Sequence, residues 1–188
     1  MKKIFFNRPL RILLSTNALI LMAGAMLFPI YAIFVKKVGG DLMDASIAGG
    51  IFALVAGLTT LLSGKYSDKV KENELIVVVG YAIMGVGFCL YFWVNSVIFL
   101  FFAQAVIGLG EAIYSPAFDA VYSKHLDHHK SGTQWSAWES MNYFTTALSA
   151  VLGGGVVTLF GFKTLFILMA LLCFSSALYI LFLKRSVL

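Results

Sequence analysis

Six long apolar stretches, separated by short polar segments, make up nearly the whole chain. They cover residues 10–34, 45–63, 75–94, 97–121, 135–160 and 164–183. Each is close to the roughly 20 apolar residues that an α-helix needs to cross a bilayer. Isolated strands are excluded because lipid leaves unpaired backbone groups unsatisfied, and the short alternating segments of an outer-membrane barrel are absent. The pattern predicts an all-α integral membrane protein, with six transmembrane helices in a single domain, residues 1–188.

The composition supports a membrane protein. Hydrophobic residues make up 60% of the 188 residues and charged residues 12%, against roughly 45–50% and 25% in soluble domains. A soluble domain of this size could not bury so much apolar surface. The basic start and the Ala-Gly-Ala at 23–25 also resemble a signal peptide, but the apolar run is too long for one and five further spans follow.

Lysine and arginine divide unequally between the two sides of the predicted membrane domain. One side carries Lys36, Lys37 and Lys163, and the other carries Lys2, Lys3, Arg8, Arg11, Lys65, Lys69, Lys71, Lys124, Lys130, Lys184 and Arg185. The side with more basic residues in its short loops is normally cytoplasmic. The distribution predicts a plasma or bacterial inner membrane protein with both termini in the cytoplasm. Since the formal charge of +5 belongs to these loops, nucleic acid is not an expected partner.

Catalytic and metal-binding patterns are weak in this sequence. Cys89 and Cys173 lie inside apolar stretches and are expected to be packing residues. Segment 122–133 contains three histidines and Asp127, but their spacing matches no strong metal motif and the flanking lysines repel a cation. A solvated loop is the favoured interpretation, with metal or pH sensing as the alternative. Without a nucleophile–base pair or a nucleotide-binding loop, the sequence predicts no enzyme activity, no cofactor and no metal.

Similar Gly- and Pro-containing segments occur twice along the chain. Residues 22–29 resemble residues 108–116, and residues 61–64 resemble residues 151–154, at an offset of about 90 residues in both cases. Three helices followed by three related helices would form an inverted pair, because each unit has an odd number of spans. The predicted repeats are residues 1–95 and 96–188. Chance is the alternative, since glycine and proline are common in membrane helices.

The loop after the second apolar stretch carries the most informative motif. Gly64 is followed after three residues by Asp68 and Lys69. This order resembles the signature of the major facilitator superfamily, which lies in the cytoplasmic loop between helices two and three. The next positions depart from the signature, because Lys71-Glu72-Asn73 stands where the family has a further glycine and basic residues.

Other segments resemble the same family at the expected places. The fourth stretch contains Gly108-Leu-Gly110, with Gln104 at a position where an arginine is common. Residues 149–154 of the fifth stretch resemble a Gly-Pro-x-x-Gly-Gly element whose first two residues are replaced. Phe160-Gly-Phe-Lys163 precedes the sixth stretch. Together they make the chain similar to the N-terminal six-helix half of that fold. The resemblance implies two inverted three-helix repeats.

Ionisable groups inside a membrane are costly, so Glu111 and Glu139 are candidates for a solute or proton pathway. Asn142 shares a stripe of polar and small residues with Glu139 at helical spacing. In the family, helices one and four line the central cavity, which implies that Asn17, Tyr114 and Glu111 face the solute. The alternatives are a structural role for Glu111 and a Glu139 side chain that reaches toward the cytoplasmic surface.

The resemblance also implies a gate and an interface. Gly64 would let two helices approach at a cytoplasmic gate, while Asp68 and Lys69 would form contacts there; the alternative is an ordinary basic loop. In the family, helices two and five meet the other half, so small residues on these helices are expected between the halves, namely Gly50, Gly57, Gly153 and Gly154. The third and sixth helices carry no charge and are expected at the lipid-facing periphery.

The function implied by the resemblance is movement of a small solute by alternating access, with protons as the candidate coupling ion. Because the family uses two six-helix halves around one cavity, a chain that supplies one half is expected to pair with a second six-helix half. A homodimer is favoured over a separate complementary half. The alternatives are a non-transporting structural or regulatory membrane subunit and a truncated transporter half.

Overall fold

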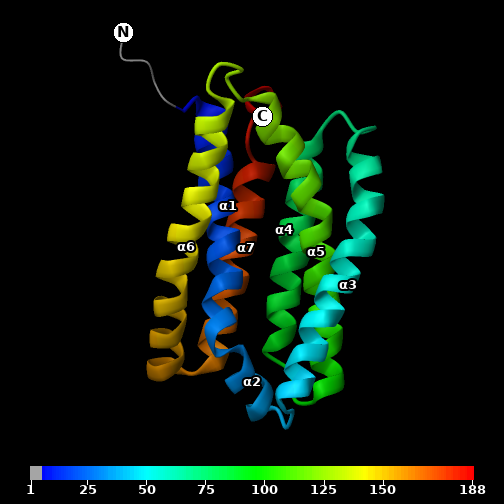
Figure 1. The fold of residues 1–188 in the computed structure, drawn as a ribbon, viewed down its shortest axis with the longest axis vertical. Coiled ribbons are helices and arrows are strands. Elements are labelled where there is room, and N and C mark those ends of the chain that lie inside the picture. Colours follow the sequence, from blue (N-terminus) through cyan, green and yellow to red (C-terminus); the bar gives the residue numbers. More distant parts are fainter. Residues whose placement is uncertain (1–5) are drawn as a thin grey trace.

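A computed structural model describes residues 6–188, apart from the Ser186 side chain, so Lys2 and Lys3 lie outside the described residues. Within that range every regular element is a helix (Figure 1). Six spans have the length and hydropathy to cross a membrane, which confirms the predicted fold class. The elements are α1 (Arg8–Leu27), η1 (Phe28–Ile30), α2 (Tyr31–Lys37), α3 (Leu42–Ser67), α4 (Asn73–Tyr91), α5 (Val97–Lys124), α6 (Ser131–Phe160), α7 (Phe162–Leu181) and η2 (Arg185–Val187).

The prolines of the two similar segments, 22–29 and 108–116, have different effects on their helices. Pro29 lies in η1, where the first span changes from α1 through a 3-10 turn into α2. Pro116 lies inside α5, which continues to Lys124. Because proline lacks a backbone N–H, it removes one helical hydrogen bond in both places, but the chain changes helix type at the first of the two alone.

Side-chain caps fix the starts of α1 and α3. At α3, the Asp44 N–H donates to Asp41 Oδ1 and the Asp41 N–H donates to Asp44 Oδ2, both at 2.9 Å, which forms a reciprocal capping box. At α1, Asn7 Oδ1 accepts a hydrogen bond from the Leu10 N–H at 2.9 Å, while Asn7 Nδ2 donates to the His125 carbonyl oxygen at 2.8 Å. The start of α1 is therefore held against the connection between α5 and α6.

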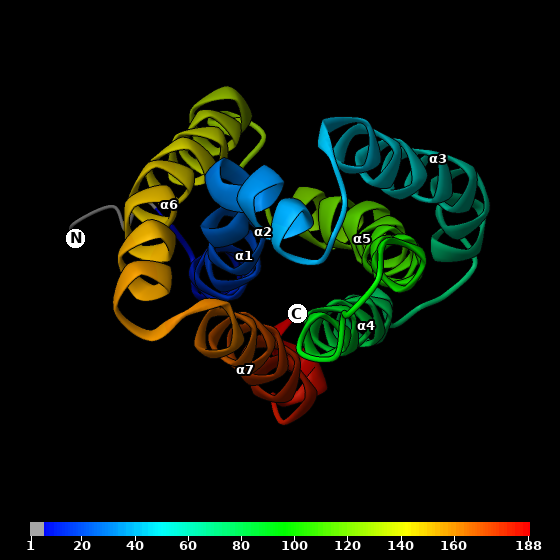
Figure 2. The same ribbon diagram turned by 90° about the horizontal axis from the view of Figure 1, so that it is seen from below.

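The helix contacts are symmetrical between the two halves of the chain. α1 packs against α6 and α7, α5 packs against α3 and α4, and α4 packs against α7 (Figure 2). Exchanging α1 with α5, α3 with α6, and α4 with α7 reproduces these five contacts, whereas the additional contact of α6 with α7 has no equally extensive counterpart between α3 and α4. Two three-helix repeats predict this pattern, while their boundary near residue 95 stays a prediction.

The described members of the two groups of basic residues lie at opposite ends of the bundle. α1 begins and α3, α5 and α7 end at one end, where the C-terminus of the chain also lies (Figure 1). We call it the basic end; it carries Arg8, Arg11, Lys65 and Lys124. At the opposite end, Lys37 Nζ lies 5.5 Å from the Phe162 ring centre and Lys163 Nζ lies 4.9 Å from that of Phe92, as cation–π contacts.

Glycines allow α4 to pack closely on α5. A Cβ atom added to Gly80 would lie 2.7 Å from the Tyr114 backbone nitrogen and 2.8 Å from the Gly110 carbonyl oxygen. Of the most apolar 18 residues of α4 and α7, 56% and 44% are buried in the bundle, against 6% for α3 and 11% for α6. α4 and α7 are the third and sixth spans, which were expected at the lipid-facing periphery. They pack more deeply in the bundle than a purely peripheral position implies, because each uses one face for contact with other helices.

The connection between α5 and α6 predicts a pH dependence of stability. Burial, with a smaller contribution from Lys124, lowers the pKa of His125. A histidine that folds in its neutral form stabilises the native state fully above its ordinary pKa of about 6.5, and this stabilisation is lost as the pH falls through the lowered pKa. We expect thermal unfolding of the purified protein to shift to lower temperature between pH 7.5 and pH 5.

His125→Gln should weaken that shift because it removes the titrating group. His128→Gln is the matched control, since His128 is an exposed histidine of the same connection. An equal loss of pH dependence in both variants would contradict the assignment.

Candidate functional site

A cavity of about 420 Å³ lies between the first span, α3, α4 and α5. Its walls are mainly apolar and aromatic, and its polar side chains come from Tyr31, Tyr91, Gln104 and Glu111. Phe28, Phe52, Phe88, Met84 and Met169 contribute the larger apolar surfaces. Concave sites with apolar walls and a few converging polar groups are typical of small-molecule binding.

The polar groups of the cavity connect α2 with α5. Gln104 Nε2 donates a hydrogen bond of 2.8 Å to Tyr31 Oη. Glu111 lies seven residues further along α5, which places it on the same helix face as Gln104. The Glu111 side chain is half-buried, and within residues 6–188 it forms neither a hydrogen bond nor an ion pair. The cavity therefore combines one linked amide–phenol pair with one unpaired carboxyl group.

Local backbone features shape the cavity. The 3-10 turn at Pro29 precedes Tyr31, so the first span changes direction directly before the residue that contacts α5. A Cβ on Gly108 would lie 2.6 Å from the Phe52 carbonyl oxygen, so α3 and α5 approach at backbone distance. This approach brings the Phe52 side chain to the cavity wall.

Two residues that were expected to face the solute lie in the core instead. Asn17 is 2% exposed and Tyr114 is 5% exposed, and neither lines the cavity. Tyr114 packs against Tyr81, with ring centres 4.9 Å apart, because Gly80 lets α4 cover this part of α5. The resemblance indicated the lining helices α1 and α5 but not which of their faces is covered.

Sequence reasoning missed Gln104 as a site residue. From the sequence alone, Gln104 stands out only as the residue at a position where an arginine is common in the family, without a role in the cavity. Its position two helical turns before Glu111 was the available signal, since polar residues at this spacing share one helix face.

The predicted polar stripe of α6 divides into two parts. Glu139 is exposed, and Asn142 is half-buried and accepts a 3.4 Å hydrogen bond from Thr146. Neither residue lines the cavity of this chain. Ser149 and Gly153 are buried, and a Cβ on Gly153 would overlap the Met26 carbonyl oxygen of α1. The small size of Gly153 therefore serves a contact inside this bundle, in contrast to the predicted contact between halves.

The other glycines of the expected interface face open space. A Cβ added to Gly50, Gly57 or Gly154 would meet no atom within 4 Å among the described residues. They lie on α3 and α6, the two spans with the smallest buried share.

The motif at the end of α3 lies at the basic end. Gly64 is half-buried, Asp68 is the exposed C-cap residue of α3, and Lys69 is exposed. Ser67 Oγ donates a 3.1 Å hydrogen bond to Asn73 Oδ1. This bond links the end of α3 to the start of α4 and fixes the turn that presents the motif.

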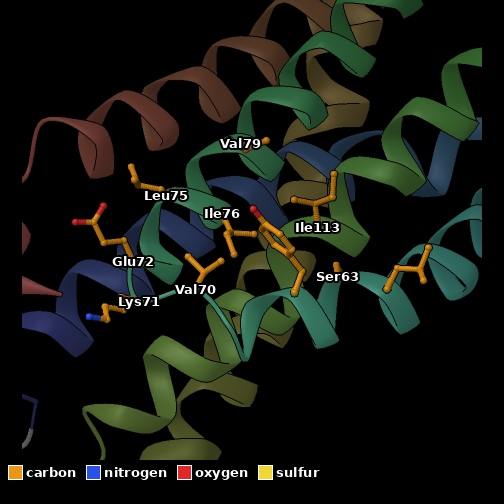
Figure 3. Close-up of a pocket in the computed structure, with 10 residues that line it drawn as sticks. Ser63, Val70, Lys71, Glu72, Leu75, Ile76, Val79 and Ile113 are labelled. Carbon is orange, nitrogen blue, oxygen red and sulfur yellow. The ribbon is translucent and has the colours of Figure 1, made fainter.

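A groove of about 820 Å³ lies beside this motif, between the end of α3 and the start of α4. Ile76 and Val79 of α4 and Ile113 of α5 form part of its apolar wall, while Lys71 and Glu72 lie at one end (Figure 3). Ser63 Oγ donates a hydrogen bond to the Ala112 carbonyl oxygen, so α3 remains attached to α5 along the groove.

Comparisons with known proteins agree with this architecture. An uncharacterised MFS-type transporter of Methanocaldococcus jannaschii is 25% identical over 175 residues, which cover 88% of this chain and 42% of that protein. A multidrug resistance protein of Dickeya zeae is 24% identical over 172 residues, covering 89% of this chain and 42% of that protein. The chain thus spans about two-fifths of these relatives.

A third relative is of similar size to this chain. An uncharacterised MFS-type transporter of Bacillus subtilis is 22% identical over 156 residues, which cover 83% of this chain and 94% of that protein. The family pattern described as Major Facilitator Superfamily matches residues 13–187. Since this match includes all six spans, the chain belongs to the major facilitator superfamily.

Proposed function

We propose that this protein moves a small organic solute across a membrane by alternating access, as one six-helix half that pairs with a second half. A second copy of the chain is the favoured partner. The observation that carries the proposal is the cavity at Tyr31, Gln104 and Glu111, because it combines apolar walls with an unpaired carboxyl group. The membrane proposed is a plasma or bacterial inner membrane, with both termini in the cytoplasm.

The exposed surfaces of α3 and α6 support pairing. Leu54, Leu58, Phe144 and Val151 are each at least half exposed on these helices. Gly50, Gly57 and Gly154 leave space beside them, and small residues favour close helix packing in membranes. A second half placed against α3 and α6 would cover the cavity formed by the first span, α3, α4 and α5 and enclose a path for the solute.

The cavity chemistry supports an organic solute. Aromatic and methionine side chains adapt to apolar ligands of varied shape, and Glu111 would attract a positive charge or hold an exchangeable proton. One relative is named a multidrug resistance protein, which fits this solute class. We therefore favour organic cations, with protons as the coupling ion.

Glu139 and Asn142 have a place in this proposal on the surface of α6. Both are accessible in a single copy, and a partner half would bring its own cavity face toward them. The gate would use Gly64, Asp68 and Lys69 at the basic end. Contacts of Asp68 with the partner would form in one state of the cycle and break in the other.

Cysteine cross-linking in a native-like bilayer tests the pairing. Leu54 and Phe144 each lie 13 residues from the basic end of α3 and α6, at matching depth. A doubly substituted Leu54→Cys, Phe144→Cys protein should form cross-linked dimers. The matched control is Val86→Cys with Phe144→Cys, because Val86 is exposed on α4, which is outside the proposed interface, and this pair should stay monomeric.

Flux into liposomes tests the transport. Purified protein should accumulate a fluorescent organic cation when a pH gradient is applied, and an ionophore that collapses the gradient should stop the accumulation. Flux without cross-linking would favour a separate complementary half. Monomeric protein without flux for any solute class would favour a non-transporting subunit or a truncated half.

A further inference from the structure

A second groove, of about 520 Å³, lies between α1 and α7 at the basic end. It is separate from the cavity at Glu111, because the two share no lining residue. Arg8, Arg11 and Ser15 of α1 and Ser175 and Tyr179 of α7 contribute its polar surface. α6 comes close to α7 near their connection at Gly161 and lies apart from it toward the basic end (Figure 2), so the groove opens to the side of the bundle.

The two arginines give the groove a positive charge. Arg8 and Arg11 are three residues apart on α1, so their side chains leave the same helix face. Both are exposed, and within residues 6–188 neither is within salt-bridge distance of a carboxylate. The residues that line the groove include none that is acidic. Guanidinium groups match phosphate oxygens in charge and in hydrogen-bond geometry.

The floor of the groove is closed by hydrogen bonds between the two helices. Ser176 Oγ donates to the Thr16 carbonyl oxygen at 3.0 Å, and Thr16 Oγ1 donates to the Ile12 carbonyl oxygen at 3.0 Å. The buried hydroxyls are therefore satisfied within the bundle. The arginines and the exposed Ser175 and Tyr179 side chains remain available to a ligand above this floor.

The groove changes from polar to apolar with depth in the membrane. Arg8 and Arg11 lie in the first turn of α1 and Tyr179 in the last turn of α7, which is the level of lipid head groups. Leu19 lies eleven residues beyond Arg8, about 16 Å deeper at the rise of an α-helix. A ligand that fills the groove is thus anionic at one end and apolar at the other.

We infer that this groove binds an anionic phospholipid, with its phosphate between Arg8 and Arg11 and an acyl chain along Leu19. Basic pockets between transmembrane helices are suited to such head groups. The inference depends on the position of the chain in a bilayer and not on transport, so its failure would leave the proposed function untouched.

Lipid binding to the purified full chain tests the inference. Native mass spectrometry should show phosphatidylglycerol retained roughly tenfold more than phosphatidylcholine. The double variant Arg8→Gln, Arg11→Gln should bind both lipids equally. The matched control Lys65→Gln, Lys124→Gln loses the same charge at the same end but outside the groove, and it should keep the preference. Loss of the preference in both double variants would overturn the inference.

A second pair of variants keeps the arginines, and with them the insertion of the first span. Ser175→Trp should fill the groove and lower phosphatidylglycerol binding severalfold, whereas Leu171→Trp, on an exposed position one turn away on α7, should not. Equal binding by both tryptophan variants would also overturn the inference. Inorganic phosphate at millimolar concentration should fail to displace the lipid; displacement would identify a free anion as the ligand and exclude the lipid.

Discussion

Leucine in place of Gly153 should destabilise the six-helix bundle strongly, while leucine in place of the adjacent Gly154 should leave its stability nearly unchanged. A Cβ at position 153 would overlap the Met26 carbonyl oxygen, which is backbone and cannot rotate away. α1 and α6 would have to separate along their contact, and overpacking of this kind costs about 1–3 kcal/mol or more. Thermal unfolding in detergent measures the difference.

Gly154 is the matched control because a Cβ there meets no described atom within 4 Å. Gly154→Leu should instead interfere with pairing, and the cross-link between Leu54→Cys and Phe144→Cys should weaken in that background. If both leucine variants unfolded at the same temperature, the close contact of α1 and α6 at Met26 would be wrong. If Gly154→Leu left cross-linking unchanged, this glycine would lie outside the interface.

Glutamine in place of Glu111 should abolish most pH-driven flux. The substitution keeps the size of the side chain but removes both its negative charge and its ability to release a proton. If Glu111 holds the coupling proton, the loss should be roughly hundredfold, the lower range for a positioned group that transfers a proton. Uptake of the fluorescent cation into liposomes at a fixed pH gradient measures the effect.

Glu72→Gln provides the control, since Glu72 is an exposed carboxyl outside the cavity and its replacement should leave flux close to wild type. Counterflow of solute without a pH gradient separates the two roles of Glu111. A variant that exchanges solute but does not accumulate it has lost coupling, whereas a variant that does neither has lost solute binding. Wild-type accumulation by Glu111→Gln would remove this residue from the pathway.

The helices could be predicted from the sequence because lipid imposes a simple rule. Every membrane span must satisfy its own backbone hydrogen bonds, so long apolar runs become helices. The structure confirms six spans, with ends that differ from the prediction by a few residues. α6, for example, begins at Ser131, inside a segment that was expected to be a loop, since polar residues continue a helix beyond the apolar core.

The site could be predicted only in part. Glu111 was identified because a carboxyl group is rare inside an apolar run, and it lines the cavity. Asn17 and Tyr114 were assigned by resemblance and lie in the core. Gln104 lines the cavity and hydrogen-bonds to Tyr31 across 73 positions of sequence, which no local pattern reveals.

The sequence by itself thus determined that this protein is built for lipid, its number of spans and the unequal division of basic residues between the two ends of the bundle, because these depend on the transfer of each segment from water to lipid. The tertiary structure alone decided which faces of those spans meet. Gly153 and Gly154 are neighbours of identical type, yet one touches the backbone of α1 and the other faces open space. Each helix residue is turned about 100° from the last, so the packing of distant helices selects the partner of each position.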